Sequence, residues 1–262
     1  EKLTALILDC AKGHLSVGQQ ATLLTAVTSN GFTPLHDAVR SGNVRLYDMV
    51  AAALDRLHRD RIIDDATYAR QFTLPTEHRF TPLHTAAKSG NSELYERLHD
   101  RLEALQKQSL LTPDDVKAQY ATSNHQGITP LMDAVRSGNT TLARSFLTDL
   151  AQLLTREEMQ RQLSHRAQDG RNVFHRAHKP STTKDIPNPL IEAALQDLFF
   201  EHFGNGRPHG NPEARQVIEK LYHQRNEDGD SAASLANSPE GSWEYRLRTL
   251  SGHNPVALPE RY

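Results

Sequence analysis

Apolar residues recur along this chain with the spacing of amphipathic helices, and the whole pattern repeats after 48 residues. Leu35, Ala38 and Val39 fall on one face of a helix, and we expect this face to be buried. The residues that begin this helix, Thr33-Pro34-Leu35-His36, return as Thr81-Pro82-Leu83-His84 and as Thr129-Pro130-Leu131-Met132. A fixed period predicts a stack of helical units, an all-α solenoid, and not a single globular core.

Each unit contains start and stop signals for two helices. Thr33 is a suitable N-cap, Pro34 fits the first helical position, and His36 is placed to hydrogen-bond back to the Thr33 hydroxyl. Gly42 ends the helix and Asn43 is a good cap for a second one. The triplet Ser-Gly-Asn is found in all three units, at residues 41–43, 89–91 and 137–139. We therefore predict helical hairpins.

An additional short helix is predicted before each hairpin. Its N-caps are polar residues 17 positions ahead of the threonine of the next motif or its equivalent, namely Ser16, Asp64, Thr112 and Thr155. Eight residues after each cap stands an apolar residue, namely Leu24, Phe72, Tyr120 and Leu163. Each repeat should therefore hold three helices.

The motif Thr-Pro-Leu-His-x-Ala, followed by Gly-Asn and an apolar helix, resembles the ankyrin repeat, although the usual period there is 33 residues. This resemblance implies a protein–protein interaction module without a cofactor. It also places a protruding finger at the polar turns 29–31, 77–79, 125–127 and 168–170. Arg79 replaces the usual glycine of this turn, so the geometry of the second finger is in doubt.

The repeats organise the chain as one elongated domain, 1–262. It consists of a half repeat at 1–30, repeats that start near 31, 79, 127 and 170, and a degenerate capping repeat near 229. An insertion separates the last two repeats, between residues 179 and 212. Because the half repeat lacks its first helix, we expect the chain to be the C-terminal part of a longer polypeptide.

Charge and composition favour a protein partner. The 30 basic and 32 acidic side chains give a formal charge of −2, so no overall field attracts nucleic acid or anionic lipid. No apolar run is long enough to cross a membrane. The single Cys10 cannot form an intramolecular disulfide, which fits a reducing cytosol. We expect a cytosolic monomer that binds neither nucleic acid nor membranes.

Residues with catalytic or metal-binding potential are better explained by structure. His165, His175 and His178 could in principle bind zinc, but no carboxylate or thiol set of suitable spacing accompanies them, and His175 matches the motif histidine. Cys10 lies on an apolar helix face, where a thiol is usually inert. The acidic stretch 227–230 lacks the alternating ligands of a calcium loop and fits a hairpin turn. We expect no catalytic, cofactor or metal site.

The long units and the Ala-Val-Arg-Ser-Gly-Asn sequence are also similar to the C-terminal ankyrin domains of bacterial type III secreted arginine ADP-riboxanase effectors. This resemblance implies that the partner is a host caspase, captured for modification by a separate N-terminal domain. It further implies a bacterial protein that acts in the host cytosol.

We expect a partner on the concave side, where the first helices and the finger turns carry variable residues: Asn30, Asp37, Arg40, His78, Thr85, Lys88, Gln126, Asp133 and Arg136. Three other interpretations stay open. The acidic and basic residues could merely form exposed contacts within one helix. The array could be a scaffold that positions a neighbouring catalytic domain of a larger enzyme. An enzyme could also be built in the insertion between 179 and 212.

Overall fold

The computed structural model describes residues 15–178, 194–195 and 212–235, and in this part of the chain the secondary structure is helical apart from one isolated bridge. The chain divides into two compact units, Glu1–Leu153 and Leu154–Tyr262. Residues 1–14 of the half repeat, including Cys10, and most of the insertion lie outside the described residues. Each unit is presented by itself below.

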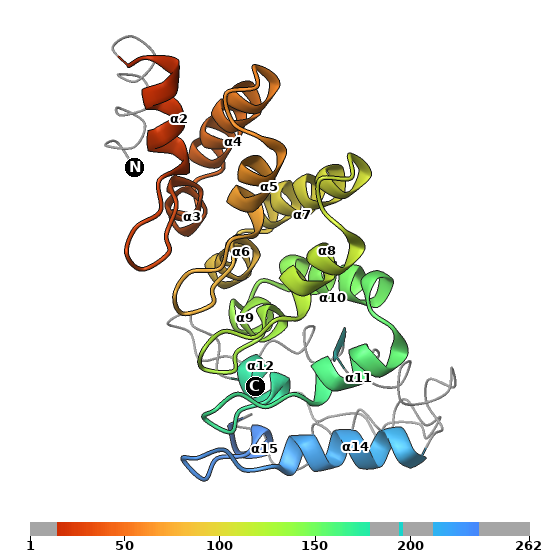
Figure 1. Ribbon diagram of the computed structural model, residues 1–262. Helices are drawn as coiled ribbons and strands as arrows, with labels where there is room; N and C mark the ends of the chain where they lie inside the picture. The colour runs from red at the N-terminus through yellow and green to blue at the C-terminus, as the bar shows by residue number, and fades with distance from the viewer. Residues whose placement is uncertain (1–14, 179–193, 196–211, 236–262) are drawn as a thin grey trace, which may run out of the picture. The chain divides into compact units, whose positions relative to one another are not determined.

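The N-terminal unit repeats a group of three helices, as the sequence predicted (Figure 1). We call the first helix of each group, which begins at the motif proline, the motif helix. The three motif helices are α3 (Pro34–Arg40), α6 (Pro82–Ser89) and α9 (Pro130–Arg136). The long second helices are α4 (Val44–Arg59), α7 (Ser92–Lys107) and α10 (Thr140–Leu153). The additional short helices are α2 (Val17–Thr25), α5 (Asp65–Thr73) and α8 (Pro113–Ala121).

The predicted capping interactions position these helices. The Thr33 side chain accepts from the His36 amide, and the His36 ring bonds back to the Thr33 hydroxyl at 2.9 Å. Ser16 and Thr112 form complete capping boxes, and Asp64 accepts from the Thr67 amide. These bonds satisfy amides that the first turn leaves free, so the helix starts are determined locally.

Neighbouring repeats are joined by buried apolar residues and by a repeated side-chain bond. Leu35, Leu83 and Leu131 of the motif helices are completely buried, and α6 packs against both α3 and α9. The Asn91 side-chain amide donates to the Gly42 carbonyl at 2.9 Å, and Asn139 donates to Gly90 at 2.8 Å. Each asparagine thus caps its own helix and also contacts the preceding repeat.

The long helices are joined through buried tyrosines and charged partners. The Arg101 guanidinium binds the Asp55 carboxylate through two hydrogen bonds of 2.8 and 2.9 Å, and the Tyr68 hydroxyl donates to the same carboxylate. One repeat further, the Tyr95 hydroxyl donates to Asp149. These contacts connect α4, α5, α7 and α10 side by side and account for the polar groups that the long helices bury.

The C-terminal unit contains α11 (Arg156–Ser164), α12 (Val173–His178), α14 (Pro212–His223) and α15 (Ala232–Leu235). Thr155 forms the predicted capping box of α11. Asn172 replaces the motif threonine, and its side chain accepts from the His175 amide. The acidic stretch 227–230 belongs to a hairpin turn closed by a bridge between Arg225 and Ser231, which confirms the turn interpretation.

Candidate interaction surface

Each repeat presents a five-residue finger with the same backbone hydrogen bonds. The fingers are the segments 28–32, 76–80, 124–128, 167–171 and 226–230. In each finger the first amide donates to the fifth carbonyl, at 2.8 to 2.9 Å, and the fourth amide donates to the first carbonyl. The fourth residue has a positive φ in every case: Gly31, Arg79, Gly127, Gly170 and Gly229. Arg79, at φ 62°, therefore reproduces the glycine geometry.

The fingers of the N-terminal unit are bonded to one another. The Glu77 amide donates to the Asn30 carbonyl at 2.9 Å, and the His125 amide donates to the His78 carbonyl at 3.0 Å. The rings of His78 and His125 meet edge to face, with centroids 5.7 Å apart. The first three fingers consequently form one connected strip beside the motif helices (Figure 1).

The motif histidines tie a finger to the preceding motif helix. His84 is fully buried, and its Nε2 bonds to the Ile128 carbonyl of the next finger at 3.1 Å. Burial lowers the pKa of His84 to about 4, although the Ile128 carbonyl raises it, and the charges of Arg79 and Lys88 lower it further. A neutral ring carries one N–H, and Nε2 can donate it to the Ile128 carbonyl.

Most of the predicted site residues lie on one surface, which we call the motif face: the solvent side of α3, α6 and α9 with the first three fingers. Thr85 and Arg136 are half-buried. Those exposed to solvent are Asn30, Asp37, Arg40, His78, Lys88 and Gln126. Asp133 does not fit the expectation, because the residue is only 2 % exposed. It is part of the folded interior and is removed from the site.

Two cations of the motif face are held against aromatic rings. The Arg40 guanidinium lies 5.2 Å from the Phe32 ring centroid, and the Lys88 ammonium lies 5.1 Å from that of Phe80. Arg40 also pairs with Asp37 at 2.8 Å. Thr85 occupies the equivalent position before Lys88, and Lys88 makes no ion pair with any described residue. The charge of Lys88 is therefore less neutralised than that of Arg40.

Arg79 belongs to this surface and was missed by the sequence-based selection. Its side chain is exposed at the finger tip, and its charge acts on His84 together with that of Lys88. Both cations therefore lie close enough to His84 to lower its pKa. A signal was present in the sequence, because an arginine stood where the other turns have glycine.

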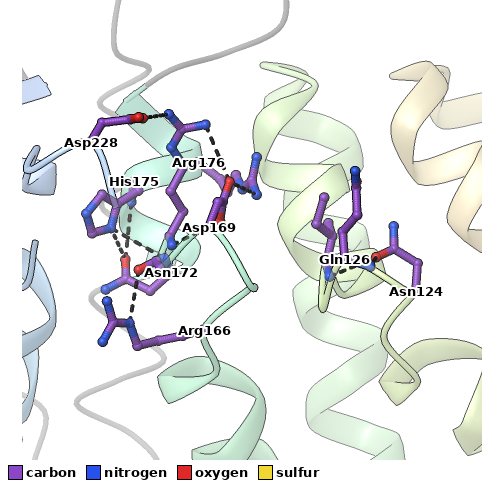
Figure 2. Close-up of polar contacts among 11 residues, drawn as sticks. Asn124, Gln126, Arg166, Asp169, Asn172, His175, Arg176 and Asp228 are labelled. Atoms are coloured by element: carbon purple, nitrogen blue, oxygen red, sulfur yellow. Dashed lines mark hydrogen bonds and ion pairs between the residues drawn. The ribbon is translucent and has the colours of Figure 1, made fainter. Parts of the chain in front are cut away.

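The equivalent surface of the C-terminal unit is occupied by internal ion pairs, as Figure 2 shows around Asp169. Arg176 follows the motif histidine, its side chain is 6 % exposed, and it pairs with Asp169 at 2.9 Å. Arg171 binds Asp169 at 3.4 Å and Asp228 at 2.7 Å. These arginines are engaged by the acidic residues of two neighbouring fingers.

The described residues give little support for a metal site. Among them, no group of three or more histidine, cysteine or acidic side chains is placed to hold a metal ion. Both ring nitrogens of His175 contact the chain, at Asn172 and at the Asp230 carbonyl. An open hollow of about 1000 Å³ lies beside the loop 58–66, where His58 and Asp65 pair at 2.7 Å. The side chain of His178 lies outside the described residues.

Comparison with known proteins identifies the repeat. The ankyrin-repeat family model matches residues 30–57, which contain α3 and most of α4. No curated protein matches the chain. None of the helices that the structure describes has both the length and the apolar character needed to cross a membrane. Ankyrin repeats are generally protein–protein interaction modules and are typically non-catalytic. The chain thus has an all-α fold of ankyrin type, in which each repeat carries an additional short helix.

Proposed function

We propose that this chain is a protein-interaction module that binds a folded protein on the motif face of its N-terminal unit. The main observation is a cation repeated at one position of three motif helices that pack side by side: Arg40 and Lys88 are exposed, and Arg136 is half-buried. Equivalent side chains of a stack form a row, and a charged row favours a partner of opposite charge and speeds association.

The connected fingers support this proposal. A surface binds with a smaller loss of conformational entropy when it is ordered before the partner arrives. The bonds from Glu77 to Asn30 and from His125 to His78 hold three finger tips in register, and the rings of Phe32 and Phe80 limit the freedom of two cations. The motif face is thus preorganised.

Charge reversal tests the location of the surface. The triple variant Arg40→Glu, Lys88→Glu, Arg136→Glu should lose the proteins that the wild-type chain captures from a cell lysate, as identified by mass spectrometry. Its melting temperature should stay nearly unchanged. The matched control reverses three exposed arginines of other helices, Arg59 and Arg144 on the long helices and Arg70 on α5. Capture that survives the first triple change and is lost in the control would contradict the assignment.

We further propose that the captured protein is a host caspase, which a separate domain of a bacterial effector then modifies. This proposal rests on the resemblance of the long units and the Ala-Val-Arg-Ser-Gly-Asn sequence to effector ankyrin domains. Purified caspases, immobilised singly, should retain the chain and release the triple variant. If no caspase of the panel binds, this assignment is wrong, while the broader interaction function stands.

A further inference from the structure

Arg79 adopts a backbone conformation that is unfavourable for its residue type. The four equivalent finger positions are glycines with φ between 73° and 84°, whereas Arg79 has φ 62°. The left-handed region costs a residue with a Cβ atom roughly 1–2 kcal/mol, and glycine avoids this cost. Glycine at position 79 would therefore give the same turn with less strain.

Among the described residues, none makes a side-chain contact with Arg79 that would offset this strain. The Arg79 side chain is exposed and makes no ion pair or hydrogen bond with the residues that the structure describes. The finger is closed by the Arg79 amide, which donates to Thr76 at 2.8 Å, and glycine has the same amide. Strained residues that the fold does not need are concentrated at functional sites.

The surroundings of Arg79 are basic. Arg79 and Lys88 both act on His84, and Lys88 is held over the ring of Phe80, which directly follows Arg79. Thr85 takes the place at which Asp37 neutralises Arg40 in the preceding repeat. Glu77, at the same finger, is exposed and forms no ion pair with the described part of the chain. Two adjacent cations are thus left to interact with solvent.

We propose that Arg79 and Lys88 together bind a carboxylate of the partner, and that the partner presents an acidic segment in extended conformation across the motif helices. This proposal rests on the interaction function proposed above. Packed helices lie about 8–10 Å apart. An extended chain in the polyproline II conformation has three residues per turn and a rise of about 3.1 Å per residue, so it covers this distance in one turn and presents every third side chain on the same face. Acidic residues at every third position would then meet Arg40, the Arg79–Lys88 pair and Arg136 in turn.

A fluorescein-labelled synthetic peptide tests this chemistry directly. The probe has glutamate at every third position in a Gly/Ser sequence, and the comparison peptide has glutamine at the same positions. Fluorescence anisotropy at low salt should show binding of the glutamate peptide only. Arg79→Gly should weaken it by roughly three- to fivefold, the range of one exposed charge contact. Arg79→Lys, which keeps the charge, should retain most of the affinity.

Arg61→Gly is the matched control. Arg61 also has a positive φ, 56°, and is exposed, but it lies in the loop after α4, on the side opposite the fingers in Figure 1. Both glycine variants remove one arginine and one strained residue, so both should raise the stability against urea. Only Arg79→Gly should weaken peptide binding.

Three results would overturn the proposal: equal affinity of wild type and Arg79→Gly, equal binding of the glutamine peptide, or stronger binding of a single-stranded oligothymidylate than of the glutamate peptide. A failure of the acidic-segment inference can be distinguished from a failure of the proposed interaction function. A chain that ignores the acidic peptide but still captures a protein through the motif face refutes only the acidic-segment inference.

Discussion

The position after the motif histidine carries different charges in the two units. In the N-terminal unit it holds Asp37, Thr85 and Asp133, and in the C-terminal unit it holds Arg176. Asp37 is exposed and pairs with Arg40 of its own helix, whereas Arg176 is buried and pairs with Asp169 of a finger. The same repeat position thus keeps its charge in solvent at Asp37 and contributes to internal packing at Arg176.

The difference shows how similar repeats can serve different purposes. In the C-terminal unit, Asp169 and Asp228 bind the available arginines, which suits a terminal repeat that closes a stack. In the N-terminal unit, Arg40, Lys88 and Arg79 keep their charges at the surface, and two of them lie on aromatic rings. Neutralised charges stabilise a fold, and accessible charges remain free to bind a partner.

Asp169→Asn should produce the largest effect. The variant keeps the shape of the side chain but leaves the nearly buried Arg176 without its carboxylate, and hydrogen bonds to charged groups contribute about 1.5–3 kcal/mol. We expect the C-terminal unit to lose roughly that much stability, measured by urea unfolding and by faster hydrogen exchange in α12. Unchanged exchange would mean that the ion pair is not important for this unit.

Histidine at position 84 should make the N-terminal unit sensitive to mild acid. Its pKa is about 4 in the fold and about 6.5 in the unfolded chain, so the unfolded state binds more protons below pH 6.5. The resulting stability is complete above pH 6.5 and decreases toward pH 4. Between pH 7 and pH 5 the loss should be about 2 kcal/mol.

The third repeat supplies the control for this experiment, because Met132 stands at the equivalent position. His84→Met should remove about 2 kcal/mol of the pH dependence in urea titrations at pH 7 and pH 5. The His175 pKa is lowered by burial as well, so a pH dependence of the same sign should remain in the C-terminal unit. Equal pH dependence of wild type and variant would contradict a neutral, buried His84.

The stacked fingers should tolerate a methyl group less well than the last one. A Cβ at Gly31 would lie 2.8 Å from the Glu77 amide nitrogen, whereas nothing lies within 4 Å at Gly229. Both residues have positive φ, so alanine costs roughly 1–2 kcal/mol at either position. The contact adds to this cost at Gly31 only. Thermal unfolding should rank Gly31→Ala below Gly229→Ala, and the reverse order would refute the bonded strip.

Asp37→Ala should have the smallest effect on stability. Exposed pairs within one helix contribute about 0.2–0.5 kcal/mol, and both partners are largely in solvent. If Arg40 contributes to binding, the variant should bind the glutamate peptide more tightly, because a competing carboxylate has been removed. A stability loss as large as that of Asp169→Asn would abolish the distinction between the two units.

The sequence by itself determined the helices, their caps and their order. Threonine, proline, glycine and asparagine at fixed spacing act through bonds within a few residues, so they can be read without knowledge of the fold. The regular period also identified the stack and, through equivalent positions, most of the exposed residues of the motif face. Asp37, Arg40 and Lys88 are exposed as expected.

Only the tertiary structure decided which of these residues reach solvent and which are neutralised. Asp133 has the sequence context of Asp37 yet is buried, and Arg171 is bound by Asp228, which lies 57 residues further along the chain. The turn at Arg79 looked doubtful because arginine replaces the usual glycine, whereas in the structure this finger has the same turn and is bonded to a neighbouring finger on each side. Burial and ion pairing depend on residues far apart in the chain, and these contacts exist only once the repeats have packed.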